Sequence, residues 1–285
     1  MLKQLTSVKE YMDFINEINR DPSFSDPMLS SEEQIRCNLL AAPDKPTNRI
    51  WGIFEGTELV GLFVFLVLEE EAYLEMLVGL SRNLNAYKEM LSFLKETYKG
   101  WQADFVYNPK NHLLHSLLAD ERARFEAEQQ KMVLERDVAC QGGRQIDLEG
   151  EISGQGGLQI ELYSPKYREQ YTAIHSRDGY WTADKVIDAP DRFRILLALE
   201  QDRVVGYMDV THKYEENEPY DLFVAEAYRR KGYGRAMLSR AIELNRPKAM
   251  MLLVDTDNTA AISLYESLGF AKAVGENNMT AHALL

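Results

Sequence analysis

A basic, glycine-containing segment in the second half of the chain is suited to bind an anion. Residues 221–238 read DLFVAEAYRRKGYGRAML, in which an apolar strand runs through a short loop into an amphipathic helix. The first N–H groups of a helix have no partner within it, and the helix dipole places partial positive charge there, so that end stabilises anions. Glycines allow the backbone to approach the anion closely. The cations and glycines of the loop are Arg229, Arg230, Lys231, Gly232, Gly234 and Arg235.

This positive loop lies in an acidic chain. The 285 residues hold 32 Lys and Arg against 45 Asp and Glu, a net charge of -13. Such a charge repels polyanions, so we expect no nucleic-acid partner, and the loop predicts a local anionic ligand such as a diphosphate. Taken alone, the same loop also fits an ordinary strand-to-helix turn with solvated basic side chains.

A second motif follows the first. The segment NTAAISLYESLGF, residues 258–270, comes directly after the apolar strand MMLLVD. The two segments carry the patterns R-x-x-G-x-G (Arg229, Gly232, Gly234) and N-x-x-A-x-x-x-Y-E-x-x-G-F (Asn258, Ala261, Tyr265, Glu266, Gly269, Phe270). In both patterns the sequence resembles the GNAT N-acetyltransferase superfamily. The resemblance extends from about Leu158 to the C-terminus and is strongest between Asp221 and Phe270.

The resemblance implies a mixed sheet that opens between its fourth and fifth strands, with acetyl-CoA as the co-substrate in the opening. The backbone of the fourth strand, at Leu222, Phe223 and Val224, would pair with the pantetheine arm as an added strand does. Asn258 would contact the cofactor from the start of the following helix. The pyrophosphate would lie beside Arg229 on the amides of Arg230, Lys231, Gly232, Tyr233, Gly234 and Arg235.

The resemblance also implies direct transfer, in which an amine attacks the thioester carbonyl, a tetrahedral oxyanion forms and CoA leaves as a thiolate. The backbone N–H of Val224 is our candidate to stabilise the oxyanion, and Tyr265 would protonate the departing sulfur as general acid. The alternative role for Tyr265 is packing on an amphipathic helix.

Several carboxylates are candidates to take the proton of the amine. Asp221 begins the fourth strand and can act directly or through water, although a strand-end carboxylate can also be merely solvated. Glu226 lies beyond the other end of the strand. Three more carboxylates precede it and either hold a cationic acceptor or serve solubility; these are Glu215, Glu216 and Glu218.

A glycine-rich segment divides the chain into halves that resemble each other. Six of the 17 glycines fall between Gly142 and Gly157. Val60-Gly61 aligns with Val205-Gly206 at an offset of 145 residues, Val78 with Val224 at 146, and Asn111 with Asn258 at 147. We predict an α/β chain with mixed, mostly antiparallel sheets flanked by helices, in two tandem GNAT-like domains over residues 1–140 and 158–285, joined by a linker over 141–157.

The first half has lost the residues of the anion site. It reads GLSRNLNA where the second half has AYRRKGYGR, so it lacks both loop glycines and keeps one cation, Arg82. At the offset of 147, Leu118 replaces Tyr265 and has no proton to give. We therefore predict a degenerate first domain that keeps the fold without the cofactor site.

The rest of the composition narrows the class of protein. Two cysteines, Cys37 and Cys140, without C-x-x-C spacing, fit reduced thiols in a cytoplasmic protein. The five histidines lack metal-ligand spacing, so we expect no metal. The longest apolar run, residues 59–68, is far shorter than the roughly 20 residues of a membrane span, so we expect no membrane partner.

These patterns predict an enzyme that transfers an acetyl group from acetyl-CoA to a primary amine of a small molecule or a peptide. The alternative is a non-catalytic module that keeps the fold and binds acyl-CoA or another protein. Release of free CoA thiol in the presence of an amine separates the two.

Overall fold

The structure is a computed structural model that describes residues 1–135, 158–177 and 181–285. The predicted linker, residues 141–157, lies outside this range. The described chain forms two compact units. The first comprises residues 1–131, 255–257 and 273–285, and the second comprises residues 132–254 and 258–272. Among the described helices none is both long and apolar enough to cross a bilayer.

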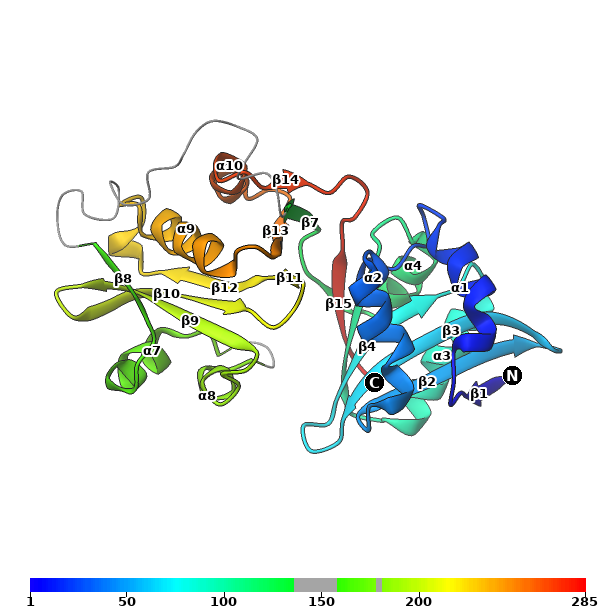
Figure 1. Cartoon of the computed structure of the whole chain (residues 1–285). Helices are drawn as coiled ribbons and strands as arrows, with labels where there is room; N and C mark the ends of the chain where they lie inside the picture. Colours follow the sequence, from blue (N-terminus) through cyan, green and yellow to red (C-terminus); the bar gives the residue numbers. More distant parts are fainter. Residues whose placement is uncertain (136–157, 178–180) are drawn as a thin grey trace. The chain divides into compact units, whose positions relative to one another are not determined.

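The first unit is built on a seven-stranded mixed sheet in the order β1-β2-β3-β4-β5-β15-β6 (Figure 1). The chain around α1 (Met12–Asn19) and α2 (Glu32–Gln34) packs on one face of this sheet, and α3 (Leu84–Thr97) and α4 (His112–Asp120) pack on the other. The strands are β1 (Leu2–Gln4), β2 (Asn48–Glu55), β3 (Glu58–Leu68), β4 (Tyr73–Leu80), β5 (Gln102–Tyr107), β6 (Arg124–Phe125) and β15 (Met279–Leu284).

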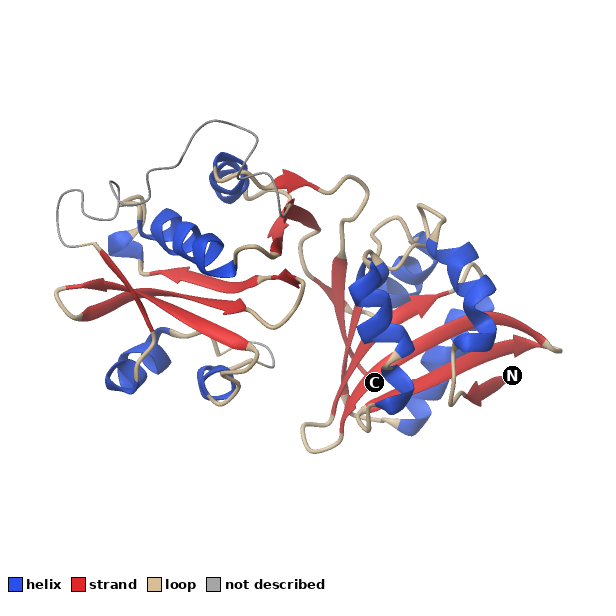
Figure 2. Cartoon of the chain, viewed as in Figure 1, coloured by secondary structure: helices blue, strands red, loops and turns tan. Residues whose placement is uncertain are grey.

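The second unit has two strand groups, ordered β12-β10-β9-β8 and β11-β13-β7-β14. Figure 2 shows helices on both sides of these strands. Helices α7 (Arg168–Ile174) and α8 (Ala183–Ile187) cover one face, and α9 (Tyr233–Asn245) and α10 (Thr259–Ser267) cover the other. The strands are β7 (Gln129–Leu134), β8 (Gln159–Leu162), β9 (Phe193–Glu200), β10 (Arg203–Thr211), β11 (Glu216–Asn217), β12 (Pro219–Val224), β13 (Ala249–Asp255) and β14 (Ala271–Lys272).

Each unit opens between its fourth and fifth strands, as the resemblance implies. In the first unit β4 pairs with β5 only over residues 73–76, and its remaining four residues diverge. In the second unit the equivalent opening lies between β12 and β13. Strand β11 pairs with the first two residues of β13, whereas β12, the strand after β11 in sequence, pairs only with β10. The edge of β12 that faces away from β10 therefore has no strand partner among the described residues.

The last strands of the two halves are exchanged between the sheets. The C-terminal strand β15 lies between β5 and β6 in the sheet of the first unit. Strand β7, which follows β6 in sequence, lies between β13 and β14 in the second unit. Neither sheet is thus completed by its own half of the sequence. The domain boundaries at 140 and 158 stay a prediction.

The sheet register supports the internal repeat and corrects one part of its alignment. The register of β2 with β3 skips Val60, and the register of β9 with β10 skips Val205. These two irregularities are 145 residues apart, which agrees with the predicted offset. The alignment of Val78 with Val224 is wrong, because Val78 lies opposite Val64 whereas Asp221 lies opposite Asp209. From Val78 to the start of α3 at Leu84 is six residues, and from Asp221 to the start of α9 at Tyr233 is twelve, so the second half has six extra residues, which lie in the basic loop.

Candidate active site

The basic loop ends at a helix N-terminus that no side chain caps. Gly232 is the N-cap of α9, with φ of 91° and no side-chain hydrogen bond to the helix amides. Arg230 is also left-handed, with φ of 63°. Left-handed residues within a turn direct successive N–H groups into a concavity that binds anions. The loop therefore presents its own amides, together with the first amides of α9, to one ligand.

The charged side chains of the loop hold its shape. The Arg229 guanidinium donates from Nε to the Val224 carbonyl at 2.9 Å, which connects the loop to the end of β12. Arg235 donates to Ser267 Oγ at 2.6 Å and so joins the start of α9 to α10. The Lys231 ammonium lies 5.0 Å from the centre of the Tyr228 ring. All three cations are exposed, so each can also meet an anion from solvent.

Strand β12 turns alternate groups toward the opening. Ala225 N–H donates to the Val205 carbonyl of β10 at 2.9 Å. Because successive amides of a strand point in opposite directions, the N–H groups of Leu222 and Val224 point away from β10. Gly206 faces Val224, and a Cβ there would lie 2.7 Å from the Phe223 carbonyl oxygen, so the glycine permits the close approach of β10.

Tyr265 and Asn258 lie at the two ends of α10. The Tyr265 ring packs near Phe270, with centroids 6.1 Å apart, and within the described chain its hydroxyl has no hydrogen-bond partner. Burial raises the pKa of this hydroxyl, so it stays protonated at neutral pH. Asn258 is the N-cap, and its side-chain oxygen accepts from Ala261 N at 3.1 Å. Asn111 caps α4 in the same way, accepting from Leu114 N at 3.2 Å, so this residue has a structural role in both halves.

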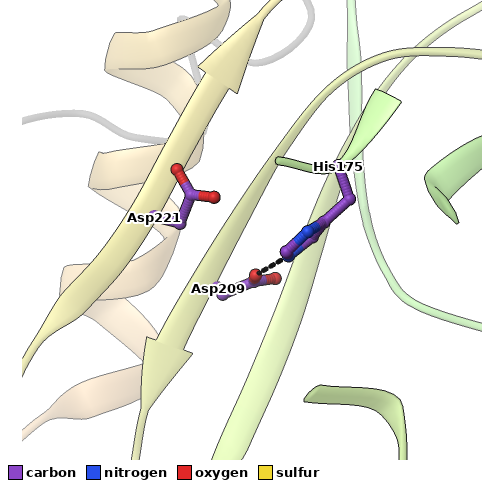
Figure 3. Close-up of side chains that lie close together, drawn as sticks. All are labelled: His175, Asp209 and Asp221. Carbon is purple, nitrogen blue, oxygen red and sulfur yellow. Dashed lines mark hydrogen bonds and ion pairs between the residues drawn. The ribbon is translucent and has the colours of Figure 1, made fainter. Parts of the chain in front are cut away.

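On the other face of the sheet, toward α7, the structure brings together a buried polar cluster (Figure 3). The Asp209 carboxylate of β10 is fully buried and accepts from the Tyr171 hydroxyl at 2.9 Å. His175 Nε2 lies 2.9 Å from Asp209 Oδ2, and its Nδ1 lies 2.7 Å from the Ser176 carbonyl. Asp221 of β12 joins the cluster by accepting from the Tyr207 hydroxyl at 2.6 Å.

The cluster alters the acidity of its members. Burial works to lower the pKa of His175, but hydrogen bonds to Asp209 and to the Ser176 carbonyl, with the charges of Asp209 and Asp221, raise it overall. Burial raises the pKa of Asp209, against the lowering effect of its bonds from His175 and Tyr171. Burial also raises the pKa values of the Tyr171 and Tyr207 hydroxyls, so both remain donors.

One atom from each of His175, Asp209 and Asp221 lies within 4.8 Å of the others, which is the one grouping of possible metal ligands in the described chain. Protein hydrogen bonds already engage each of these groups. We therefore interpret the cluster as a hydrogen-bonded network rather than a metal centre.

The sequence patterns did not identify four members of this cluster, His175, Asp209, Tyr171 and Tyr207. A signal was present, because Asp209 interrupts the apolar strand VVGYMDV, where an acidic side chain has to be buried. Tyr171 and His175 are four residues apart and so share a helix face, and Tyr207 and Asp209 share a strand face. Glu226 is exposed beyond β12. The Trp181 ring packs on the Phe193 ring, with centroids 4.8 Å apart.

The equivalent opening of the first unit is filled by its own chain. The Asp26 carboxylate accepts from Gly79 N–H of β4 at 2.7 Å, and Asn108 donates to the Pro22 carbonyl and to Ser25 Oγ. The cavity beside them has a volume of about 210 Å³ and no basic side chain in its lining. Ligand pockets usually measure ~300 to 1,000 Å³, so this space is too small and has the wrong charge for a nucleotide cofactor.

The helix that follows this opening also differs from α9. Asn83 caps α3 with its side chain, which accepts from Asn85 N at 2.8 Å and from Ala86 N. Arg82 pairs with Glu17 at 2.7 Å and with Asp21 at 3.1 Å. In the first unit the first amides of α3 and the Arg82 guanidinium thus have partners within the unit. In the second unit the first amides of α9 have no side-chain cap, and the cations of the basic loop are exposed.

Comparison with known proteins agrees with this geometry. The model of the Acetyltransferase (GNAT) family matches residues 159–270. The whole chain superposes on a GCN5-related N-acetyltransferase from Sphaerobacter thermophilus, covering 95% of that chain with a TM-score of 0.63 and 13% identity. It also superposes on a tandem GNAT protein from the clavulanic acid biosynthesis pathway, covering 98% of that chain with a TM-score of 0.58 and 10% identity. Residues 159–270 thus match the GNAT family, and the chain has the two-domain, mixed α/β fold of these solved structures.

Curated relatives match shorter segments. A mycothiol acetyltransferase from Renibacterium salmoninarum is 47% identical over 19% of this chain and 17% of its own length. A second, from Corynebacterium efficiens, is 32% identical over 35% of this chain and 36% of its own length. The N-alpha-acetyltransferase RimI of Mycobacterium tuberculosis is 39% identical over 24% of this chain and 46% of its own length. The matched segments thus span less than half the length of each of these relatives.

Proposed function

We propose that the protein is a CoA-dependent N-acetyltransferase that carries one acetyl-CoA site per chain, in its second unit, and acts on a primary amine. One observation carries the proposal: the uncapped N-terminus of α9, with left-handed Arg230 and Gly232 before it, follows directly on the open edge of β12. The diphosphate of CoA would cap the helix, and the acyl arm would lie along β12. A cytoplasmic location, expected from the sequence, is part of the same proposal.

In the proposed reaction the acceptor approaches from the α7 side, where Asp221 lies. A protonated amine transfers a proton to Asp221, and the free amine then attacks the thioester carbonyl. The Val224 N–H, which points into the opening, would donate to the oxyanion that forms. As the C–S bond breaks, Tyr265 would protonate the sulfur, and the proton that the nitrogen loses would return to Tyr265 through solvent. The products are an acetamide, CoA thiol and one proton, which Asp221 releases to solvent.

The named relatives support nitrogen as the acceptor atom without fixing the acceptor. One name refers to the acetylation of mycothiol and the other to N-alpha-acetylation. A small-molecule amine and a peptide amine both remain within the proposal, and a panel of the two kinds separates them. A chain that binds CoA but turns over no amine would instead be a binding module.

Calorimetric titration of acetyl-CoA into the full-length chain tests the site. We expect micromolar binding, about -8 kcal/mol, at one site per chain. Gly232→Asp should abolish binding, because it puts a carboxylate where the diphosphate would lie. Gly100→Asp is the matched control, since Gly100 is also left-handed, at φ of 83°, with open space around its Cβ position. Equal affinity of wild type and Gly232→Asp, or two sites per chain, would contradict the proposal.

A further inference from the structure

The buried pair of His175 and Asp209 holds one shared proton. A carbonyl oxygen can only accept, so His175 Nδ1 must donate its hydrogen to Ser176. Nε2 then faces the Asp209 carboxylate at 2.9 Å, with one proton between the two atoms. The Tyr171 hydroxyl donates to the same carboxylate. The pair is therefore neutral as a whole, which is the condition for burying it in an apolar core.

A second set of contacts leads from this pair to Asp221. Ser176, whose carbonyl accepts from His175, donates its own N–H to the Tyr207 hydroxyl oxygen at 3.0 Å. Because that N–H occupies one lone pair of the hydroxyl, the Tyr207 O–H is directed at Asp221 Oδ2, 2.6 Å away. The His175 and Tyr207 rings are stacked, with centroids 4.8 Å apart and an interplanar angle of 14°. The tyrosine hydroxyl is thus fixed by backbone and ring contacts together.

These contacts decide which residue carries the net charge of the cluster on the face of the sheet toward α7. Two carboxylates and one imidazole lie within 4.8 Å of one another. Since the shared proton cancels the charge of Asp209, Asp221 provides the net negative charge of the cluster. One of its oxygens is occupied by Tyr207, and the carboxylate is only partly buried. Its second oxygen is therefore the one that can take a proton from a cationic amine.

We propose that His175, Asp209 and Tyr207 are positioning residues for Asp221: the first two neutralise each other behind it, and Tyr207 fixes its carboxylate for proton transfer. The inference rests on the proposed function and assigns the acceptor as a cation before reaction. Within the described chain, the titratable groups that face His175 are Tyr171 of α7, Tyr207 and Asp209 of β10, and Asp221 of β12.

The coupling can be measured without any turnover. In the full-length chain labelled with [15N]histidine, the His175 signal is assigned by its loss in His175→Gln, and its titration midpoint is followed by NMR. We expect a midpoint above that of free histidine in the wild type. Asp221→Asn should lower it, because the negative charge of Asp221 favours imidazolium. Asp13→Asn, at an exposed site in the first unit, should leave it unchanged. An unchanged midpoint in Asp221→Asn would refute the coupling.

The positioning role is tested with Tyr207→Phe, which removes one hydroxyl and keeps the ring. Because this hydroxyl fixes the carboxylate that takes the proton of the amine, we expect kcat to fall about tenfold or more at neutral pH. The KM for acetyl-CoA should stay unchanged, because Tyr207 lies outside the proposed cofactor site. Tyr167→Phe is the control, since its hydroxyl points to Glu161 and Asp202.

Failure of the positioning role and failure of the proposed function give different results. A merely structural role for Tyr207 would lower stability and leave kcat unchanged, and that result would overturn the positioning role. Absence of thiol release with every amine would contradict the proposed function, whereas the NMR titration would still decide the coupling of His175 to Asp221.

Discussion

The Asp26 carboxylate of the first unit accepts a hydrogen bond from the Gly79 amide at 2.7 Å. Gly79 lies opposite Phe63 as Leu222 lies opposite Met208 in the second unit, so the two amides are equivalent in the repeated fold. The amide that would meet the acyl arm in the second unit thus meets a side chain of the same chain in the first. This contact explains in physical terms why the first unit is expected to add no second cofactor site.

Burial of Asp26 makes the stability of the first unit depend on pH. Burial raises the pKa of this carboxyl to about 7, against lowering bonds from Gly79 and Met28. The folded state therefore keeps a proton that the unfolded chain loses near pH 4, and stability should fall as pH rises from about 4 to about 7. The full shift corresponds to about 4 kcal/mol.

Urea unfolding at pH 5 and pH 7.5 measures this effect. Asp26→Asn keeps an acceptor oxygen and cannot ionise, so its free energy of unfolding should fall less than that of the wild type between the two pH values. Asp13→Asn, on the exposed face of α1, should follow the wild type. Parallel pH dependence of wild type and Asp26→Asn would show that Asp26 is not the group responsible.

The exchanged strand β15 makes the first unit depend on the last residues of the chain. Ala281 is fully buried between β5 and β6, whereas Leu284 on the same strand is 79% exposed. Ala281→Asp buries a charge and should lower the free energy of unfolding by roughly 3 kcal/mol or more. Leu284→Asp should change it by about 0.5 kcal/mol or less. Trp51 and Trp101 fluorescence in urea reports on this unit, and equal effects of the two variants would contradict the packing.

The repeat could be predicted from the sequence because it depends on local patterns, and the opening between strands was expected because the two contiguous motifs resemble those of a known family. The exchange of β7 and β15 could not. Both strands are short, and their pairing joins residues as far apart as Thr280 and Val106, for which a single sequence carries no signal. The error at Val78 has a related cause, since an offset that drifts smoothly from 145 to 147 does not locate the six extra residues in the loop after this strand.

One part of the candidate site could be predicted from the sequence and another part could not. The basic loop and Tyr265 belong to contiguous motifs, and the structure places the loop at an uncapped helix end. The cluster at Asp221 is assembled from α7, β10 and β12, and its members are conspicuous only once three separate segments are folded together. Asp209 was the detectable member, as an acidic residue within an apolar strand.

Tyr265→Phe tests the proposed acid step. In the proposed reaction the hydroxyl acts only as the C–S bond breaks, so its loss should leave acetyl-CoA affinity unchanged. Turnover should fall by ~100-fold or more, the usual contribution of a general acid. Calorimetry gives the affinity, and release of CoA thiol gives the turnover.

The pH dependence adds a second criterion for the same variant. Burial raises the pKa of Tyr265, so in the wild type the loss of its proton should lower kcat only at strongly basic pH. The Phe variant has no such proton and should lack this basic limb. If Tyr265→Phe keeps wild-type turnover, or keeps the basic limb at reduced turnover, another group protonates the sulfur and Tyr265 serves to pack α10 against Phe270.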